Sequence, residues 1–102
     1  MQIFHFNVIY LDKIIPDLEG SAFSDHADAQ REAFRSLCSI VADDVEKGRR
    51  IDVRQIDVLA PDGSRLHSVT LAELITAVVP FDDDLFFSEV AEQLTRTGDL
   101  DA

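Results

Sequence analysis

The segment from Asp25 to Lys47 has the clearest periodicity in the chain, with apolar residues at the three- and four-residue spacing of an α-helix. One side of this helix would collect eight apolar residues within about 160° of arc, and charged residues take the opposite side. The eight are Ala27, Ala33, Phe34, Leu37, Cys38, Ile40, Val41 and Val45. Asp25 and Asp28 have the spacing of a capping box, and Gly48 can end the helix in the left-handed conformation. The pattern predicts one long amphipathic helix that lies on a sheet.

Strand-like patterns precede this helix. From Met1 to Tyr10, Phe4, Phe6, Val8 and Tyr10 alternate with the residues of the opposite face. A shorter strand begins at Ile14-Ile15, and Pro16 suits an edge because proline donates no backbone hydrogen bond. Residues 17–20 have the composition of a turn, and residues 22–24 lead into the helix cap. This half of the chain therefore predicts two strands.

A second pair of strands follows the helix. The β-branched residues Ile51, Val53, Ile56 and Val58 change parity between Val53 and Ile56, which indicates either a bulge near Gln55 or a strand that starts at about Arg54. We favour the later start. Residues 60–64, Ala-Pro-Asp-Gly-Ser, form a strong turn signal, so a returning strand from Arg65 to about Val69 should complete a hairpin.

Two short helices are expected after this hairpin. Thr70 and Glu73 form a capping box at the start of an apolar stripe that ends before Pro80. The stripe consists of Leu71, Leu74, Ile75 and Val78. Three aspartates, Asp82 to Asp84, would cap the next helix, Gly98 would end it, and the last three residues would fray. Its apolar stripe would consist of Phe86, Phe87, Val90, Ala91 and Leu94.

These elements predict an α+β fold with a four-stranded, mostly antiparallel sheet in the order strand-strand-helix-strand-strand. The long helix should lie on one face of the sheet, and the two short helices should follow. We expect residues 1–80 to form the core domain and residues 81–102 to form an acidic helix and tail, which pack on the core or on a partner.

The charge of the chain narrows the choice of partner. The sequence has 20 acidic and 9 basic residues, a net charge of −11, and residues 81–102 alone contribute −6. This charge disfavours direct binding to nucleic acid or to an anionic membrane and favours a basic protein partner. No run approaches the roughly 20 apolar residues of a membrane span, and no secretory signal is recognisable. A soluble, cytoplasmic protein is expected, with its single Cys38 in the core.

Two resemblances support this reading. The aromatic strand Ile3-Phe4-His5-Phe6, the turn containing Asp17, Glu19 and Gly20, and the helix around residues 28–33 resemble a family of short bacterial proteins of unknown function, over roughly residues 2–69. The run Pro16-Asp17-Leu18-Glu19-Gly20 followed by a capped helix is more distantly similar to HicB-like antitoxins. That similarity implies a protein that neutralises a small toxin by binding it. The chain has no recognisable DNA-binding appendage, so it does not imply autoregulation at an operator.

Catalytic motifs are absent from the sequence. It contains no phosphate-binding loop, no Cys-x-x-Cys or His-x-x-x-His pair, and no nucleophile with an adjacent base. His5, His26 and His67 are widely separated, and the acids Asp43, Asp44 and Glu46 fit a solvated helix face. We therefore predict no enzyme activity, no catalytic or cofactor-binding residue, no metal site and no cofactor.

The acidic C-terminal segment is the predicted partner-binding site. It combines carboxylates with large apolar side chains, which suits a basic, apolar-lined surface. The predicted residues are Asp82, Asp83, Asp84, Phe86, Phe87, Glu89, Val90 and Leu94. The favoured function is a small non-enzymatic interaction module, antitoxin-like or inhibitor-like. The alternatives are a nucleic-acid mimic of the phage type, a small metal-dependent enzyme or sensor that uses His5 or His67, and a homodimer in which these apolar residues form the interface.

Overall fold

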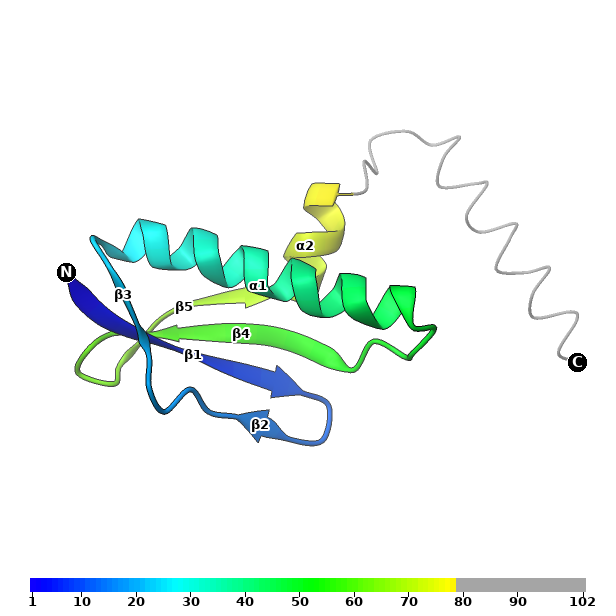
Figure 1. Cartoon of the computed structure of the whole chain (residues 1–102), viewed down its shortest axis with the longest axis horizontal. Coiled ribbons are helices and arrows are strands. Elements are labelled where there is room, and N and C mark those ends of the chain that lie inside the picture. The colour runs from blue at the N-terminus through cyan, green and yellow to red at the C-terminus, as the bar shows by residue number, and fades with distance from the viewer. Residues whose placement is uncertain (79–102) are drawn as a thin grey trace, which may run out of the picture.

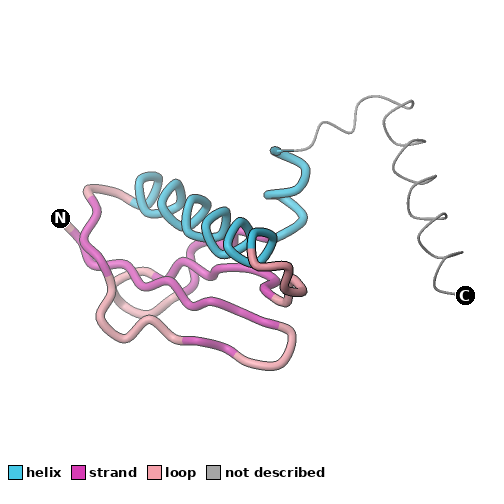
Figure 2. Tube along the Cα trace, turned by 45° about the vertical axis from the view of Figure 1, so that its right-hand side comes forward, coloured by secondary structure: helices cyan, strands magenta, loops and turns pink. Residues whose placement is uncertain are grey.

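The computed structural model describes residues 1–78. An antiparallel sheet of five strands carries the long helix on one face, and a second, short helix lies on the same side of the sheet (Figures 1 and 2). The elements are β1 (Gln2–Tyr10), β2 (Ile14–Ile15), β3 (Ser21–Phe23), α1 (His26–Glu46), β4 (Val53–Leu59), β5 (Arg65–Thr70) and α2 (Leu71–Val78). The predicted α+β class, the antiparallel pairing, both hairpins and the position of the long helix are confirmed.

The sheet has the strand order β2-β1-β4-β5, with β3 also paired to β1. The two short strands share one edge of β1: β3 pairs with residues 2–4, and β2 pairs with Val8 and Ile9. The prediction of four strands is therefore wrong by one. Three residues are too few to show an alternating pattern, and β3 is a strand because of its partner on β1.

Asp17 bridges the gap that β2 and β3 leave along β1. Its Oδ2 accepts a hydrogen bond from the Phe6 backbone N–H at 3.0 Å, and its Oδ1 accepts one from the Gly20 N–H at 3.0 Å. The Asp17 N–H in turn donates to Oδ1 of Asn7 at 3.1 Å. Gly20 has φ of +74°, and a Cβ there would lie 2.6 Å from Cγ2 of Ile3, so only glycine fits this close approach. The turn predicted at residues 17–20 is thus bonded to β1 through Asp17.

A β-bulge explains the change of parity in β4. Ile9 lies opposite Gln55 and Tyr10 opposite Val53, so Arg54 is an extra residue in the β4 strand. The bulge lets Val53 and Ile56 both point at the core, and both are fully buried. Our preference for a strand that starts near Arg54 is therefore wrong, and the bulge is the correct alternative.

Helix α1 begins and ends largely as predicted. Oδ1 of Asp25 accepts a hydrogen bond from the Asp28 N–H at 2.9 Å, and Gly48 has φ of +67°. The reciprocal half of the capping box is absent, because the Asp28 carboxylate accepts from the Ser24 hydroxyl instead.

The core lies between α1 and the helix-facing side of the sheet. It consists of Phe4, Ala29, Ala33, Leu37, Val53, Ile56, Val58, Val69 and Leu74. The buried stripe of α1 is narrower than the predicted arc: Val45 is 65% exposed, Ala27 is also exposed, and Ala29 is buried in their place. Cys38 is partly buried against this core. The predicted third helix and the predicted tail fall outside the described residues.

Candidate functional site

All eight predicted partner-binding residues, from Asp82 to Leu94, lie outside the described residues 1–78. The structure therefore shows only the surface from which that segment continues. This surface is formed by α2, the neighbouring edge of β5 and the side of α1 that faces them.

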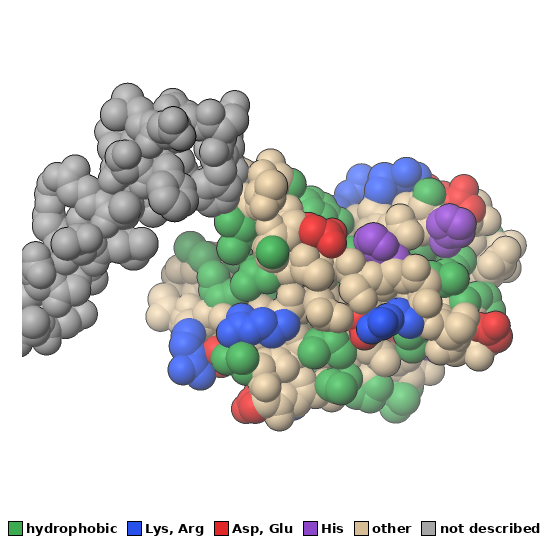
Figure 3. All heavy atoms as spheres, turned by 180° about the vertical axis from the view of Figure 1, so that it is seen from behind, with side chains coloured by type: hydrophobic (Ala, Val, Ile, Leu, Met, Phe, Trp, Pro, Cys, Tyr) green, Lys and Arg blue, Asp and Glu red, His purple; other side chains and the backbone are tan. Residues whose placement is uncertain are grey.

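Helix α2 leaves much of its apolar stripe exposed. The Thr70 hydroxyl accepts a hydrogen bond from the Glu73 N–H at 3.1 Å, as the predicted cap requires. Within the stripe, Leu74 is buried, whereas Ile75 is 39% and Val78 is 58% exposed. Hydrophobic side chains accordingly gather over α2 in the space-filling view (Figure 3). Two apolar side chains, Ile75 and Val78, are thus exposed shortly before the acidic segment.

A groove of about 470 Å³ lies between α1 and β5, with the first turn of α2 at one end. Its walls are Ala27, Gln30, Arg31, Phe34, Arg35, His67, Val69 and Glu73. The groove exists because α1 lies mainly over β4 and only partly over β5, the last strand of the sheet. Ala27 and Val69 are too small to fill the remaining space.

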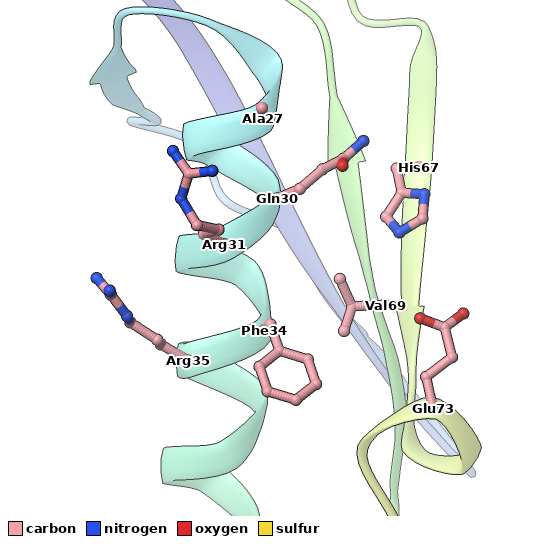
Figure 4. A pocket seen from close by; sticks show the side chains of 8 residues that line it. All are labelled: Ala27, Gln30, Arg31, Phe34, Arg35, His67, Val69 and Glu73. Carbon is pink, nitrogen blue, oxygen red and sulfur yellow. The ribbon is translucent and has the colours of Figure 1, made fainter. Parts of the chain in front are cut away.

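The side chains of the groove differ in the direction that they take. Figure 4 shows Phe34 reaching from α1 towards Val69, while Glu73 and His67 extend into the groove from the opposite wall. The guanidinium groups of Arg31 and Arg35 turn away from it. They form ion pairs with acids on their own helix, Arg31 with Asp28 and Arg35 with Glu32 at 3.7 Å.

The Glu73 carboxylate is the negative group of the groove. The Glu73 backbone N–H donates to the Thr70 hydroxyl that caps α2, but no ion pair or side-chain hydrogen bond joins the Glu73 carboxylate to another residue among 1–78. Phe34 is half-buried and packs on the core with part of its ring open to the groove. A carboxylate and an aromatic ring on facing walls are the groups that bind a cationic side chain.

Basic residues at the far end of α1 are already paired. Lys47 lies 3.1 Å from Asp43, and Arg49 contacts Asp43 at 2.6 Å and Asp44 at 3.1 Å. The hydrogen bond from Lys47 lowers the pKa of Asp43. A similar bond from Arg50 lowers the pKa of Asp52. This end of the molecule is locally neutralised and offers little net charge to a partner.

The face of the sheet opposite α1 carries a small polar network. Oδ1 of Asp57 on β4 accepts hydrogen bonds from the Ser68 hydroxyl at 2.6 Å and from Nε2 of Gln55 at 2.7 Å. On β1, Nδ1 of His5 donates to the carbonyl of Asp17 at 2.7 Å. These hydrogen bonds join side chains on the strands to neighbouring groups and support the sheet.

The three histidines lie in different parts of the described chain, on β1, at the start of α1 and on β5. Among residues 1–78, no group of three or more His, Cys, Asp or Glu side chains is arranged to hold a metal ion. Neither helix in this range has the length and apolar character required to cross a membrane.

Sequence reasoning missed the groove, although it placed most of its residues correctly on their elements. The sequence pattern places Phe34 and Ala27 on the buried face of the helix and indicates only a capping role for Glu73. The groove depends on where α1 crosses the sheet, and no local pattern encodes that crossing.

Comparison with known families places most of the described chain in one domain. The model of a family described as a domain of unknown function, DUF6894, matches residues 3–72. The matched range runs from the second residue of β1 through the other four strands and α1 to the second residue of α2. It contains every groove residue except Glu73. No curated protein and no solved structure gives a significant match to the chain.

Proposed function

This chain belongs to the DUF6894 family, a domain of unknown function, and we propose that it is a small, acidic, non-enzymatic module that binds a basic partner protein. In this proposal it acts like an antitoxin or an inhibitor, and it works in the bacterial cytoplasm. The binding surface consists of the acidic segment from Asp82 to Leu94 and the exposed apolar side of α2 that precedes it.

The distribution of charge carries the proposal. Residues 1–78 hold 13 acidic and 8 basic residues, whereas residues 81–102 hold seven acidic residues and a single basic one. In the described part, most basic residues have an acidic partner, as in the group formed by Lys47, Arg49 and Arg50. The uncompensated charge is therefore concentrated in the segment that follows α2. Such a concentration attracts a basic surface and speeds its association.

The resemblance to HicB-like antitoxins is the second line of support. It rests on the run Pro16-Asp17-Leu18-Glu19-Gly20 and on the capped helix that follows it. In this chain the run is bonded to β1 through Asp17, and the helix is capped by Asp25. An antitoxin of this kind blocks its toxin by binding, which requires complementary surfaces and no catalytic residue.

The test compares the wild-type chain with the variant Asp82→Asn/Asp83→Asn/Asp84→Asn. Each is used to purify binding proteins from the native host, and the affinity of any basic protein retained by the wild type is then measured at increasing salt. We expect binding that weakens steeply with salt and is lost in the variant, because screening shortens the range of the attraction from about 10 Å at 0.1 M to about 3 Å at 1 M.

A matched variant, Asp43→Asn/Asp44→Asn/Glu46→Gln, removes the same charge from the far end of α1 and should retain the partner. Equal loss of binding in both variants would show that only net charge matters and would contradict the proposed site. Dimerisation that does not depend on the salt concentration and is abolished by Phe86→Ala or Leu94→Ala would favour the homodimer. The nucleic-acid mimic would be favoured if the retained protein binds nucleic acid and this chain displaces the nucleic acid from it.

A further inference from the structure

We propose that the groove between α1 and β5 receives a basic side chain, arginine or lysine, from the partner protein. This inference rests on the proposed function, because it assumes a basic partner, and it adds the place where one of the partner's cations is held. It also assigns roles to Glu73 and Phe34, which neither the family nor the sequence pattern indicates.

Charge complementarity is the first argument. The Glu73 carboxylate extends into the groove (Figure 4) and forms no ion pair with another residue among 1–78. Arg31 and Arg35, the two cations at the groove's outer edge, turn away from it and pair with Asp28 and Glu32. A cation that enters the groove therefore meets a carboxylate, whereas an anion would be repelled by Glu73.

The aromatic wall is the second argument. Phe34 lies on α1 opposite Val69 and Glu73, so a guanidinium or ammonium group beside Glu73 can also lie over the Phe34 ring. A cation within about 6 Å of a ring centroid is attracted by the negative face of the ring. Gln30 lines the same groove and can accept a hydrogen bond through its amide oxygen. These groups come from two helices, so the fold fixes their spacing.

The dimensions of the groove fit a side chain as the ligand. Its volume of about 470 Å³ is within the range of roughly 300–1,000 Å³ that is common for small-molecule sites. An arginine side chain occupies part of such a space and buries its aliphatic stem against Ala27 and Val69. Arginine is also among the residues that most often dominate the binding energy of protein interfaces. The exposed apolar residues Ile75 and Val78 extend the same surface beyond the groove.

The test uses the full chain and a chemically defined probe, N-acetylarginine N-methylamide, added at low ionic strength and followed by NMR. We expect saturable shifts of the resonances of Phe34, His67 and Glu73. The variant Glu73→Gln should weaken binding three- to tenfold, since it removes the charge and leaves in place the backbone hydrogen bond from residue 73 to the Thr70 hydroxyl. The matched control Glu46→Gln removes one charge from an exposed residue at the other end of α1 and should leave binding unchanged.

The aromatic contribution is tested separately. Phe34→Leu keeps an apolar side chain but loses the ring, and it should weaken binding of the probe. Phe34→Tyr keeps an aromatic ring and should bind the probe as the wild type does. A loss of fold in Phe34→Leu would be visible in the amide spectrum and would leave the Glu73→Gln comparison as the deciding measurement.

Three results would overturn the proposal. The probe could shift only residues 79–102, Glu46→Gln could weaken binding as much as Glu73→Gln, or N-acetylglutamate N-methylamide could shift the groove residues in place of the arginine probe. None of these measurements requires the partner protein, so they can refute the proposed cation site without refuting the proposed function. The latter is decided by the salt dependence and by the Asp82–Asp84 variant.

Discussion

Replacement of Asp17 by alanine should destabilise the fold by about 2 kcal/mol. The Asp17 carboxylate accepts two backbone hydrogen bonds at 3.0 Å, from Phe6 and from Gly20, at the edge of β1 where neither β2 nor β3 pairs with the middle of the strand. Hydrogen bonds to a charged group are worth about 1.5–3 kcal/mol each. Both bonds are partly exposed to water, which can replace the lost acceptor, so we take about 1 kcal/mol for each. The total is a large fraction of the stability of a small domain.

The assay is urea unfolding of the full chain, followed by far-ultraviolet circular dichroism. With a slope of about 2 kcal/mol per M, the midpoint of Asp17→Ala should fall by about 1 M. Asp17→Asn retains one oxygen acceptor and should lose about half as much. The neighbouring variant Leu18→Ala changes a side chain that is 85% exposed and should stay within about 0.5 kcal/mol of the wild type. A midpoint for Asp17→Ala that equals that of Leu18→Ala would refute the role assigned to the carboxylate.

Two further predictions concern stability. Leu37→Ala should lower the free energy of unfolding by about 2–5 kcal/mol because this side chain is fully buried. Val45→Ala, at a side chain that is 65% exposed, should lower it by about 0.5 kcal/mol or less. The urea midpoints of the two variants test this difference, and similar values would contradict the observed burial. Hydrogen bonds from the Ser64 side chain and backbone lower the pKa of Asp62 in the folded state. The stabilisation by Asp62 is therefore present above its ordinary pKa of about 3.9 and is lost as the pH falls through the lower folded value. Asp62→Ala should be less stable than the wild type at pH 7, and this difference in stability should vanish in strong acid. Urea unfolding measured from pH 7 to strong acid tests the prediction. A difference in stability that persists in strong acid would show that the charged carboxylate does not cause it.

Features of the fold that depend on local spacing could be predicted from the sequence. The cap at Asp25, the left-handed Gly48 and the turn between β4 and β5 are each fixed by residues within a few positions of one another. The periodicity of α1 likewise identified Ala33 and Leu37 as core residues. In these cases the physical cause is contained in the segment that shows the pattern.

Features that depend on contacts between distant segments could not be predicted in the same way. Strand β3 exists because residues 21–23 meet the start of β1, and the bulge at Arg54 exists because Val53 and Ile56 must both reach the core. The sequence predicts Asp17 only as part of a turn, whereas its carboxylate accepts hydrogen bonds because two edge strands leave a gap beside β1. The candidate groove belongs to this second class, since its walls come from α1, β5 and α2.

The groove follows from an incomplete match between the helix and the sheet. Helix α1 has 21 residues, about 31 Å at 1.5 Å per residue, and it lies chiefly over β4. The core needs the central stripe of Ala29, Ala33 and Leu37, and these positions set how α1 lies on the sheet. Part of Phe34 therefore remains open beside β5, although burying an aromatic side chain would stabilise the domain. Helix α2 could close this space only if its apolar stripe turned towards α1, but Leu74 alone is buried, and Glu73 is the residue that reaches the groove. The open part of the Phe34 ring is unfavourable in water, whereas the Glu73 carboxylate is exposed and hydrated. A bound cation would cover the ring and form an ion pair with Glu73, which lowers the free energy. This difference in energy is why we infer a partner's basic side chain for this space rather than a gap left by imperfect packing.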